Sequence, residues 1–206
     1  PGLKMADFGT RRRHSYLWQD WCVQALQEGL GEAFTGTSNC LIAMKRDIEA
    51  IGTNAHELPM VYAALAGNDA ELAQAPYQVL ADWHDEHDGN LRVILPDTYG
   101  TAGSLKNAPD WLASWTGIRI DSGDIASLSR QGRSMLDDAG FPKAKITISN
   151  ALDENIIESL LHQGAPIDNF GIGEKLITSA SSPVLSGVYK LAAIEQDGKI
   201  IPKIKI

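Results

Sequence analysis

Short apolar runs alternate with longer helical patterns along most of the 206-residue chain. Apolar residues recur at helical spacing between Trp18 and Leu30, whereas Leu91–Leu95 is a short and almost wholly apolar run. The pattern predicts strands at 33–38, 49–53, 91–95, 117–121, 145–149 and 169–173. It predicts helices at 18–30, 41–44, 60–66, 76–87, 109–115, 127–139 and 155–162.

This alternation is typical of an α/β fold with a parallel sheet covered by helices. An irregular (β/α) barrel, incomplete in this chain, fits it better than an open sheet. The tail differs, because residues 188–195 and 199–204 flank an Asp197-Gly198 turn and read as a β-hairpin. We expect a partial barrel domain over 1–187 and, over 188–206, a hairpin that contributes to an accessory sheet.

Composition narrows the choice of function. Lys and Arg total 18 and Asp and Glu total 26, so the formal charge is −8, and non-specific nucleic-acid binding is disfavoured. No apolar run reaches the roughly 20 residues that span a bilayer, and no secretory signal is visible, so we expect a cytoplasmic protein without a membrane partner. Cys22 and Cys40 have no metal-ligand spacing and are expected to be buried, reduced thiols.

The chain opens on Pro1, already inside a patterned segment, and not on an initiator Met. We therefore expect an internal fragment of a longer protein. A processed or engineered terminus would look the same.

Polar residues gather at the carboxyl ends of the predicted strands. They are Thr37, Ser38 and Asn39; Thr53 and His56; Asp97 and Thr98; Arg119, Asp121, Ser122 and Asp124; Ser149 and Asn150; and Gly171 and Gly173. Loops at these ends carry the active sites of barrels and of open α/β sheets. Six such groups in register favour an enzyme over a structural or interaction module.

Two motifs contain arginine. Arg11-Arg12-Arg13 follows an aromatic ring and a glycine, which suits a flat anionic substrate or a phosphate, although a solvated basic turn has the same composition. Arg119 and Asp121 point to the same face of a strand. They suit an anion and ribose hydroxyls or Mg²⁺, or they form an ion pair followed by a helix N-cap at Asp124.

Two further motifs also allow two interpretations. Gly171-Ile172-Gly173 after a strand could present backbone N–H groups to a phosphate, or could simply form a tight turn. His56 next to Glu57 could be an oriented, nucleophilic imidazole, or an ordinary loop histidine.

Taken together, seven motifs resemble the nicotinate phosphoribosyltransferase family. They are Asp7-Phe-Gly-Thr-Arg-Arg-Arg13, Gly36-Thr-Ser-Asn39, Gly52-Thr-Asn-Ala-His-Glu57, Asp97-Thr98, Arg119-Ile-Asp-Ser-Gly-Asp124, Phe170-Gly-Ile-Gly173 and Val188-Tyr-Lys-Leu191. Their order and spacing cover nearly the whole chain. The resemblance implies the irregular barrel of type II phosphoribosyltransferases, with the N-terminal part of the family mostly absent.

The resemblance also implies a reaction and a set of roles. Nicotinate and 5-phosphoribosyl 1-diphosphate (PRPP) would give nicotinate mononucleotide and diphosphate, in NAD salvage, coupled to ATP hydrolysis. Nicotinate would be bound by Phe8, Ser38 and Arg119, with a neutral Ser38 where nicotinamide-using relatives have an aspartate. His56, phosphorylated by ATP, would act with Arg119 and Asp121 in catalysis. PRPP and phosphate would be held by Arg11, Thr37, Asp121, Ser149, Asn150, Gly171 and Gly173.

The partners implied are small molecules: nicotinate, PRPP and ATP, the last two with Mg²⁺, for which no side-chain metal ligand is assigned. The full-length protein is expected to be a homodimer. Glu174-Lys175 stands where the family more often has a small residue, and a carboxylate next to a phosphate needs a pairing partner. The alternatives are a nicotinamide or quinolinate phosphoribosyltransferase, and a non-catalytic paralogue that binds nucleotide or pyridine.

Overall fold

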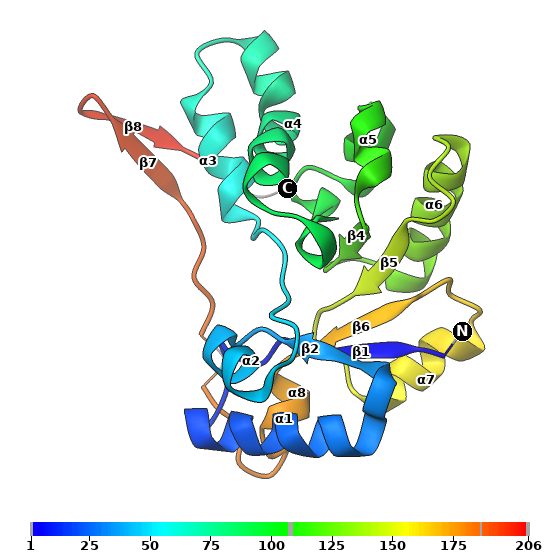
Figure 1. Ribbon diagram of the computed structural model, residues 1–206. Helices are drawn as coiled ribbons and strands as arrows, with labels where there is room; N and C mark the ends of the chain where they lie inside the picture. Colours follow the sequence, from blue (N-terminus) through cyan, green and yellow to red (C-terminus); the bar gives the residue numbers. More distant parts are fainter. Residues whose placement is uncertain (1, 107–108, 186, 205–206) are drawn as a thin grey trace. The chain divides into compact units, whose positions relative to one another are not determined.

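The computed structural model describes residues 2–106, 109–185 and 187–204. The chain divides into two compact units (Figure 1). The first comprises Pro1–Gly52, Ile120–Arg130 and Lys145–Gly187, and the second comprises Thr53–Arg119, Gln131–Ala144 and Val188–Ile206. One of the passages from the first unit to the second lies between residues 187 and 188, and the expected division into a barrel domain over 1–187 and a hairpin over 188–206 stays a prediction.

Four parallel strands form the centre of the first unit, in the order β2-β1-β6-β5. They are β1 (Lys4–Asp7), β2 (Phe34–Thr37), β5 (Lys145–Ile148) and β6 (Asn169–Ile172). Asp7, the last residue of β1, is in register with Thr37 of β2 and Ile172 of β6. The sequence pattern did not predict β1, which is four residues long and is fully buried at Ala6 and Asp7.

Helices cover this part of the sheet. They are α1 (Tyr16–Leu30), which continues into a 3-10 turn (Gly31–Ala33), α2 (Cys40–Arg46), α7 (Glu154–His162) and α8 (Glu174–Ile177). Ser15 caps α1 by accepting a hydrogen bond from the Trp18 backbone N–H. α1 and α8 lie against each other (Figure 1), and the Trp18 indole donates to the Ile177 carbonyl at 2.8 Å. This contact fixes α1 against α8.

The second unit combines helices with a short pair of strands. Its elements are α3 (Glu57–Leu65), α4 (Asp69–Glu86), α5 (Thr101–Lys106), β3 (Val93–Ile94) and 3-10 turns at Gly89–Leu91, Pro96–Thr98 and Asp110–Ser114. β3 pairs in parallel with β4 (Gly117–Ile120). Both β4 and α6 (Ile125–Asp138) cross the boundary between the units. The predicted α/β class with parallel strands is confirmed.

The predicted C-terminal hairpin is also confirmed. β7 (Ala193–Gln196) and β8 (Lys199–Pro202) pair antiparallel, and the turn residues Asp197 and Gly198 have φ values of 51° and 75°. Two left-handed residues in a row are what a two-residue turn of type I′ requires. Whether this hairpin joins an accessory sheet stays a prediction.

The segment 49–53 does not form a strand, and that expectation is wrong. Ala50 makes an isolated bridge to Thr37, with Thr37 N–H donating to the Glu49 carbonyl at 3.1 Å and Ile51 N–H to the Thr37 carbonyl at 3.0 Å. A Cβ at Gly36 would lie 2.4 Å from the Glu49 oxygen. Because the glycine has no side chain, the two backbone segments can approach closely here. They pair at one residue and then diverge.

Three other boundaries differ from the predictions. The predicted helix at 109–115 is a 3-10 turn, and the strand at 91–95 is only the two residues of β3, because residues 89–91 form a 3-10 turn first. α4 begins at Asp69, with an Asn68 cap, and continues through Pro76. A proline in the interior of a helix usually argues against a continuous helix, which is why the pattern placed the start there.

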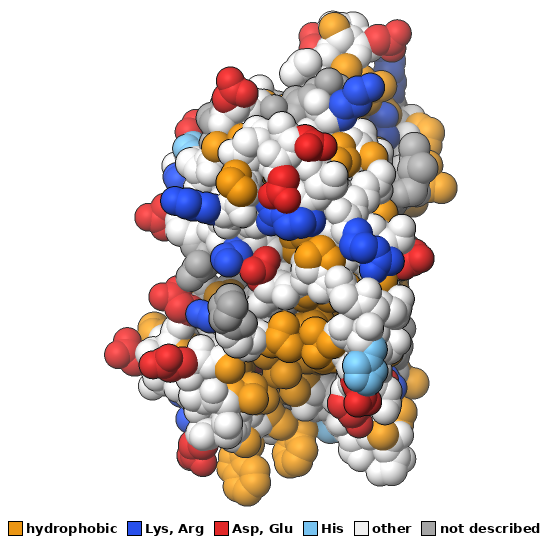
Figure 2. Space-filling model, turned by 90° about the vertical axis from the view of Figure 1, so that its right-hand side faces the viewer, with side chains coloured by type: hydrophobic (Ala, Val, Ile, Leu, Met, Phe, Trp, Pro, Cys, Tyr) orange, Lys and Arg blue, Asp and Glu red, His pale blue; other side chains and the backbone are white. Residues whose placement is uncertain are grey.

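Acidic and basic side chains are interspersed over the face shown in Figure 2, with apolar side chains between them. Large apolar side chains are exposed, among them Leu17, Trp21 and Met44 on α1 and α2. Of the helices that the structure describes, none has the length and apolar character needed to cross a bilayer.

The two cysteines differ in exposure. Cys40 begins α2 and is exposed, while the following turn buries Ile42 and Ala43, so the expectation of a buried thiol is wrong for Cys40. Cys22 is half-buried, and its burial, together with the negative charge of Asp7, raises the pKa of its thiol.

We predict that iodoacetamide at pH 8 alkylates Cys40 first. A raised pKa leaves less thiolate on Cys22, so its rate should be lower by roughly tenfold or more. Mass mapping of quenched samples measures both rates, and Cys40→Ser should leave only the slow reaction. Equal rates at the two cysteines under native conditions would contradict the assignment.

Candidate active site

The carboxylate of Asp7 organises the carboxyl end of β1 and β2. It has no solvent exposure and accepts hydrogen bonds from the Gly9 backbone N–H at 2.7 Å, from Gln19 Nε2 at 2.7 Å and from the Thr37 hydroxyl at 2.6 Å. The Asp7 carbonyl accepts from the Ser38 N–H at 2.7 Å. One residue thus ties together the loops that follow two neighbouring strands.

Gln19 extends this network from α1. Its Nε2 also donates to the Thr10 hydroxyl at 3.0 Å, and its Oε1 accepts from Asn39 Nδ2 at 2.9 Å and from Arg13 Nη1 at 2.6 Å. Asn39 in turn caps α2, because its Oδ1 accepts from the Ile42 N–H. Every polar atom of the fully buried Gln19 side chain is therefore used.

The Phe8 ring occupies the space that a side chain at position 171 would fill. A Cβ at Gly171 would lie 2.7 Å from a Phe8 ring carbon, and one at Gly173 would lie 3.1 Å from the Phe8 carbonyl oxygen. The Phe8 N–H donates to the Ile172 carbonyl at 2.8 Å, which fixes the backbone below the ring. Both glycines are thus explained by close packing against Phe8.

The three arginines after Phe8 have different surroundings. Arg12 Nη1 pairs with Glu174 at 3.2 Å, and Arg13 donates to Gln19. Arg11 is exposed, and its guanidinium makes no hydrogen bond or ion pair to the described residues. Glu174 therefore has its pairing partner in Arg12, and Arg11 is the guanidinium that can bind an anion.

The hydroxyl of Ser38 lies beside this loop. It is 2.8 Å from the Thr10 hydroxyl, and it accepts from the Thr10 N–H at 3.3 Å. A small neutral side chain stands at this position, next to a loop that carries three arginines.

Asp121 and Ser149 also lie together in the first unit. The Ser149 hydroxyl donates to the Asp121 carboxylate, and the Ser149 N–H donates to the Ile120 carbonyl at 3.0 Å. Asn150 follows with an exposed side chain and a φ of 91°. An asparagine in this left-handed region is uncommon and marks a sharply turned loop.

His56 belongs to the second unit, at the start of α3. Its Nδ1 lies 3.0 Å from the Thr98 hydroxyl and 3.8 Å from the Asp97 carboxylate, and all three residues are buried. A carboxylate near Nδ1 favours the tautomer with the proton on that nitrogen, which leaves the lone pair on Nε2. Arg119 is a half-buried residue of the same unit.

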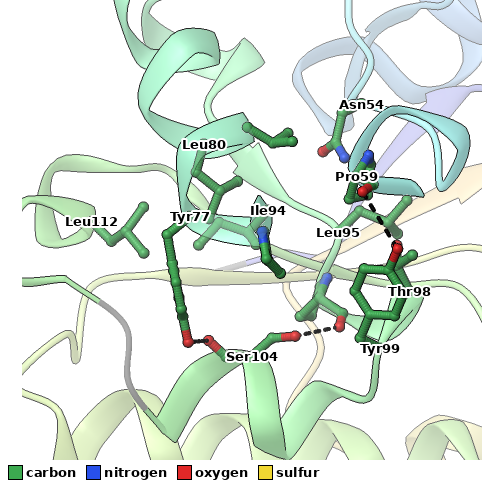
Figure 3. A pocket seen from close by; sticks show the side chains of 13 residues that line it. Asn54, Pro59, Tyr77, Leu80, Ile94, Leu95, Thr98, Tyr99, Ser104 and Leu112 are labelled. Carbon is green, nitrogen blue, oxygen red and sulfur yellow. Dashed lines mark hydrogen bonds between the residues drawn. The ribbon is translucent and has the colours of Figure 1, made fainter. Parts of the chain in front are cut away.

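A small cavity in the second unit includes Thr98 in its lining (Figure 3). Its walls are mainly apolar, and Tyr77 and Tyr99 donate hydrogen bonds to the carbonyls of Ser104 and Pro59. Burial raises the pKa of both tyrosines, so they remain protonated donors at neutral pH. The cavity volume of about 30 Å³ admits a water molecule or two, whereas a benzene-binding cavity has about 150 Å³. This cavity is therefore too small for an aromatic substrate.

The structure brings together several residues predicted for one site, and it gives one of them a different role. Phe8, Ser38, Gly171 and Gly173 surround the same loop, and Asp121 lies against Ser149. Thr37 is fully buried, and its hydroxyl donates to Asp7, so a phosphate contact through that hydroxyl would first break this bond. Among the described residues, no group of three or more His, Cys, Asp or Glu side chains could hold a metal ion.

Sequence reasoning missed Asp7, Thr10 and Gln19 as parts of the site. Gln19 lies in an ordinary helical pattern and Asp7 ends a strand that the pattern did not reveal. The available signal was the density of polar residues in the segment from Asp7 to Arg13.

Parallel strands with polar, partly cationic loops at their carboxyl ends are the arrangement in which α/β proteins place their ligand sites. Comparison with known proteins narrows this class. The model of the nicotinate phosphoribosyltransferase family matches residues 3–205. The chain therefore belongs to the nicotinate phosphoribosyltransferase family, as its motifs suggested.

Solved structures of nicotinate phosphoribosyltransferases support this family assignment. A nicotinate phosphoribosyltransferase from Porphyromonas gingivalis is 27% identical, with a TM-score of 0.76, over 88% of this chain and 48% of its own. One from Vibrio cholerae is 25% identical, with a TM-score of 0.75, over 90% of this chain and 46% of its own. The chain thus spans about half the length of these relatives.

We predict that Gly171→Ala destabilises the protein, because the new methyl group would collide with the Phe8 ring. The expected loss in free energy of unfolding is about 1–3 kcal/mol, measured by denaturant titration. Gly29→Ala is the control: it adds a methyl group in open space near the end of α1, and should be neutral or stabilising by about 0.5–1 kcal/mol. If Gly171→Ala unfolds at the wild-type midpoint, the ring does not impose this constraint.

Proposed function

We propose that the full-length protein joins nicotinate to the phosphoribosyl group of PRPP. The pyridine nitrogen attacks ribose C1 as the bond from C1 to the diphosphate oxygen breaks, giving nicotinate mononucleotide and diphosphate. The observation that carries the proposal is the family match over residues 3–205, together with a loop that holds Phe8 and the free Arg11 guanidinium next to a neutral Ser38.

The first unit supplies the contacts to an anionic ring. Phe8 offers an aromatic face, and its packing on Gly171 fixes the plane of that face. Arg11 can bind a carboxylate or phosphate, because its guanidinium is not engaged by the described residues, unlike those of Arg12 and Arg13. Ser38 carries no charge to repel the carboxylate of nicotinate. We assign Arg119, in the second unit, to the base as well, on the family resemblance.

Asp121 is assigned to the ribose hydroxyls. Its carboxylate is already oriented by the Ser149 hydroxyl, and that bond can be exchanged for one to the sugar without exposing a new charge. We assign Asn150, Gly171 and Gly173 to the phosphate groups with Ser149, on the family resemblance. The contacts of both glycines to Phe8 limit them to backbone donors.

His56 is assigned as the residue that ATP phosphorylates. The bond from the γ-phosphorus to the bridging oxygen of ATP breaks, a bond from phosphorus to Nε2 forms, and ADP leaves. Nε2 is the acceptor because Nδ1 is directed to Thr98 and Asp97. Hydrolysis of this phosphohistidine would couple ATP to ordering of the site.

Mg²⁺ is proposed to enter with PRPP and ATP, whose phosphate oxygens supply most of its ligands. When bound, Mg²⁺ neutralises charge on the leaving diphosphate. A homodimer and a cytoplasmic location are proposed on the same resemblance.

We predict that the full-length protein forms nicotinate mononucleotide from nicotinate, PRPP and Mg²⁺, and that ATP stimulates this reaction. Product is measured by chromatography, with nicotinamide and quinolinate as competing substrates. His56→Ala should abolish the stimulation by ATP, because the proposed role of His56 is to couple ATP hydrolysis to ordering of the site. His162→Ala, at the exposed end of α7, is the matched control and should retain the stimulation.

Each other outcome identifies an alternative. Product from nicotinamide or quinolinate in place of nicotinate would reassign the substrate. Binding of nicotinate without turnover in a folded full-length protein would indicate a non-catalytic paralogue. Stimulation by ATP that survives in His56→Ala would remove the phosphohistidine and leave the transferase activity standing.

A further inference from the structure

The donor and acceptor roles around Gln19 can be assigned from one end of the network to the other. The Asp7 carboxylate accepts and cannot donate, so the Gln19 atom facing it must be the amide nitrogen. At the other end of the amide, Arg13 can only donate, so the atom facing it must be the amide oxygen. The N-cap of α2 turns Asn39 so that its NH₂ group also faces that oxygen.

This fixed orientation reaches Thr10. Gln19 Nε2 has two hydrogens, of which one is donated to Asp7 and the other to the Thr10 hydroxyl. The Thr10 oxygen therefore accepts from Gln19, and its own hydrogen remains to be donated. The Ser38 oxygen, at 2.8 Å, is the acceptor within reach.

Ser38 is the end of the chain of hydrogen bonds. With Thr10 as the donor of the bond between the two hydroxyls, the Ser38 oxygen accepts from the Thr10 hydroxyl and from the Thr10 N–H at 3.3 Å, which uses both of its lone pairs. The Ser38 hydroxyl hydrogen has no acceptor in this arrangement among the described residues. It can only be donated outward, to a ligand or to water.

We propose that Gln19 and Thr10 are positioning residues that make Ser38 a hydrogen-bond donor toward the carboxylate of the pyridine substrate. The inference rests on the proposed function and deepens it, since it explains why a neutral hydroxyl at this position favours an anion. A hydroxyl whose lone pairs are occupied gives an anion a charge-assisted bond, but it cannot accept from the NH₂ group of an amide.

The Thr10 side chain allows an almost isosteric test in the full-length enzyme. Thr10→Val removes the hydroxyl and keeps the shape and the backbone donor to Ser38, while Thr10→Ser keeps the hydroxyl. We expect Thr10→Val to raise KM for nicotinate by roughly tenfold, with KM for PRPP within about twofold of wild type, because one charge-assisted bond is weakened. Thr10→Ser should leave KM for nicotinate near the wild-type value.

A double-mutant cycle separates positioning from a general structural effect. In a Ser38→Ala background, Thr10→Val should change KM for nicotinate by less than about twofold, because the donor that it positions is gone. Gln19→Met should resemble Thr10→Val in its effect on nicotinate, and its folding is checked by circular dichroism. Gln24→Met is the control and should behave as wild type, because the Gln24 amide bonds only Glu28 on the same helix and Arg46 on α2, outside the network around Asp7.

The outcomes of this experiment distinguish the two proposals. If the wild-type enzyme turns over nicotinate and Thr10→Val has an unchanged KM for nicotinate, the positioning role is overturned and the proposed function stands. An additive effect of Thr10→Val in the Ser38→Ala background also overturns the positioning role. A folded wild-type enzyme that does not use nicotinate overturns both, since the donor then has no carboxylate to receive it.

Discussion

The carboxylate of Asp7, held without solvent exposure at the end of a central strand, is the interaction on which the loops of the first unit depend. A buried carboxylate is tolerated only where donors replace its water, and each such hydrogen bond contributes about 1.5–3 kcal/mol. The three donors come from the loop after β1, from α1 and from β2. Satisfying one charge therefore fixes three separate segments of the chain relative to one another.

The same need for hydrogen-bond partners gives the three consecutive arginines different roles. Gln19 gives its NH₂ group to Asp7 and Thr10, so its carbonyl oxygen must find donors, and Arg13 is one of them. Glu174 takes Arg12. Of the three arginines, the exposed Arg11 is the one whose guanidinium can bind a ligand. A run of three like residues thus contains two structural side chains and one candidate binding side chain, a division that depends on partners far away in sequence.

This dependence on partners that are distant in sequence explains which features of the structure could be predicted from the sequence. Helices such as α1 and α7, and the Asp197-Gly198 hairpin, follow from local periodicity and turn chemistry, and they were predicted. β1 was not, because four residues carry too little pattern. The motifs identified the family and several residues of the loop at Phe8. Gln19 could not be found, since a glutamine in a helix becomes informative only when Asp7 and Asn39 are placed around it.

His56 shows the same physical device with a different result. Asp97 and Thr98 direct Nδ1 of its imidazole, much as Asp7 directs the amide of Gln19. A carboxylate beside an amide fixes a hydrogen-bond donor that does not change with pH, whereas a carboxylate beside an imidazole selects a tautomer and leaves a nucleophilic nitrogen. In the roles proposed for Ser38 and His56, buried carboxylates serve two purposes: to set the polarity of a hydroxyl in the first unit and to prepare a nucleophile in the second. Each purpose follows from the chemistry of the side chain that the carboxylate faces.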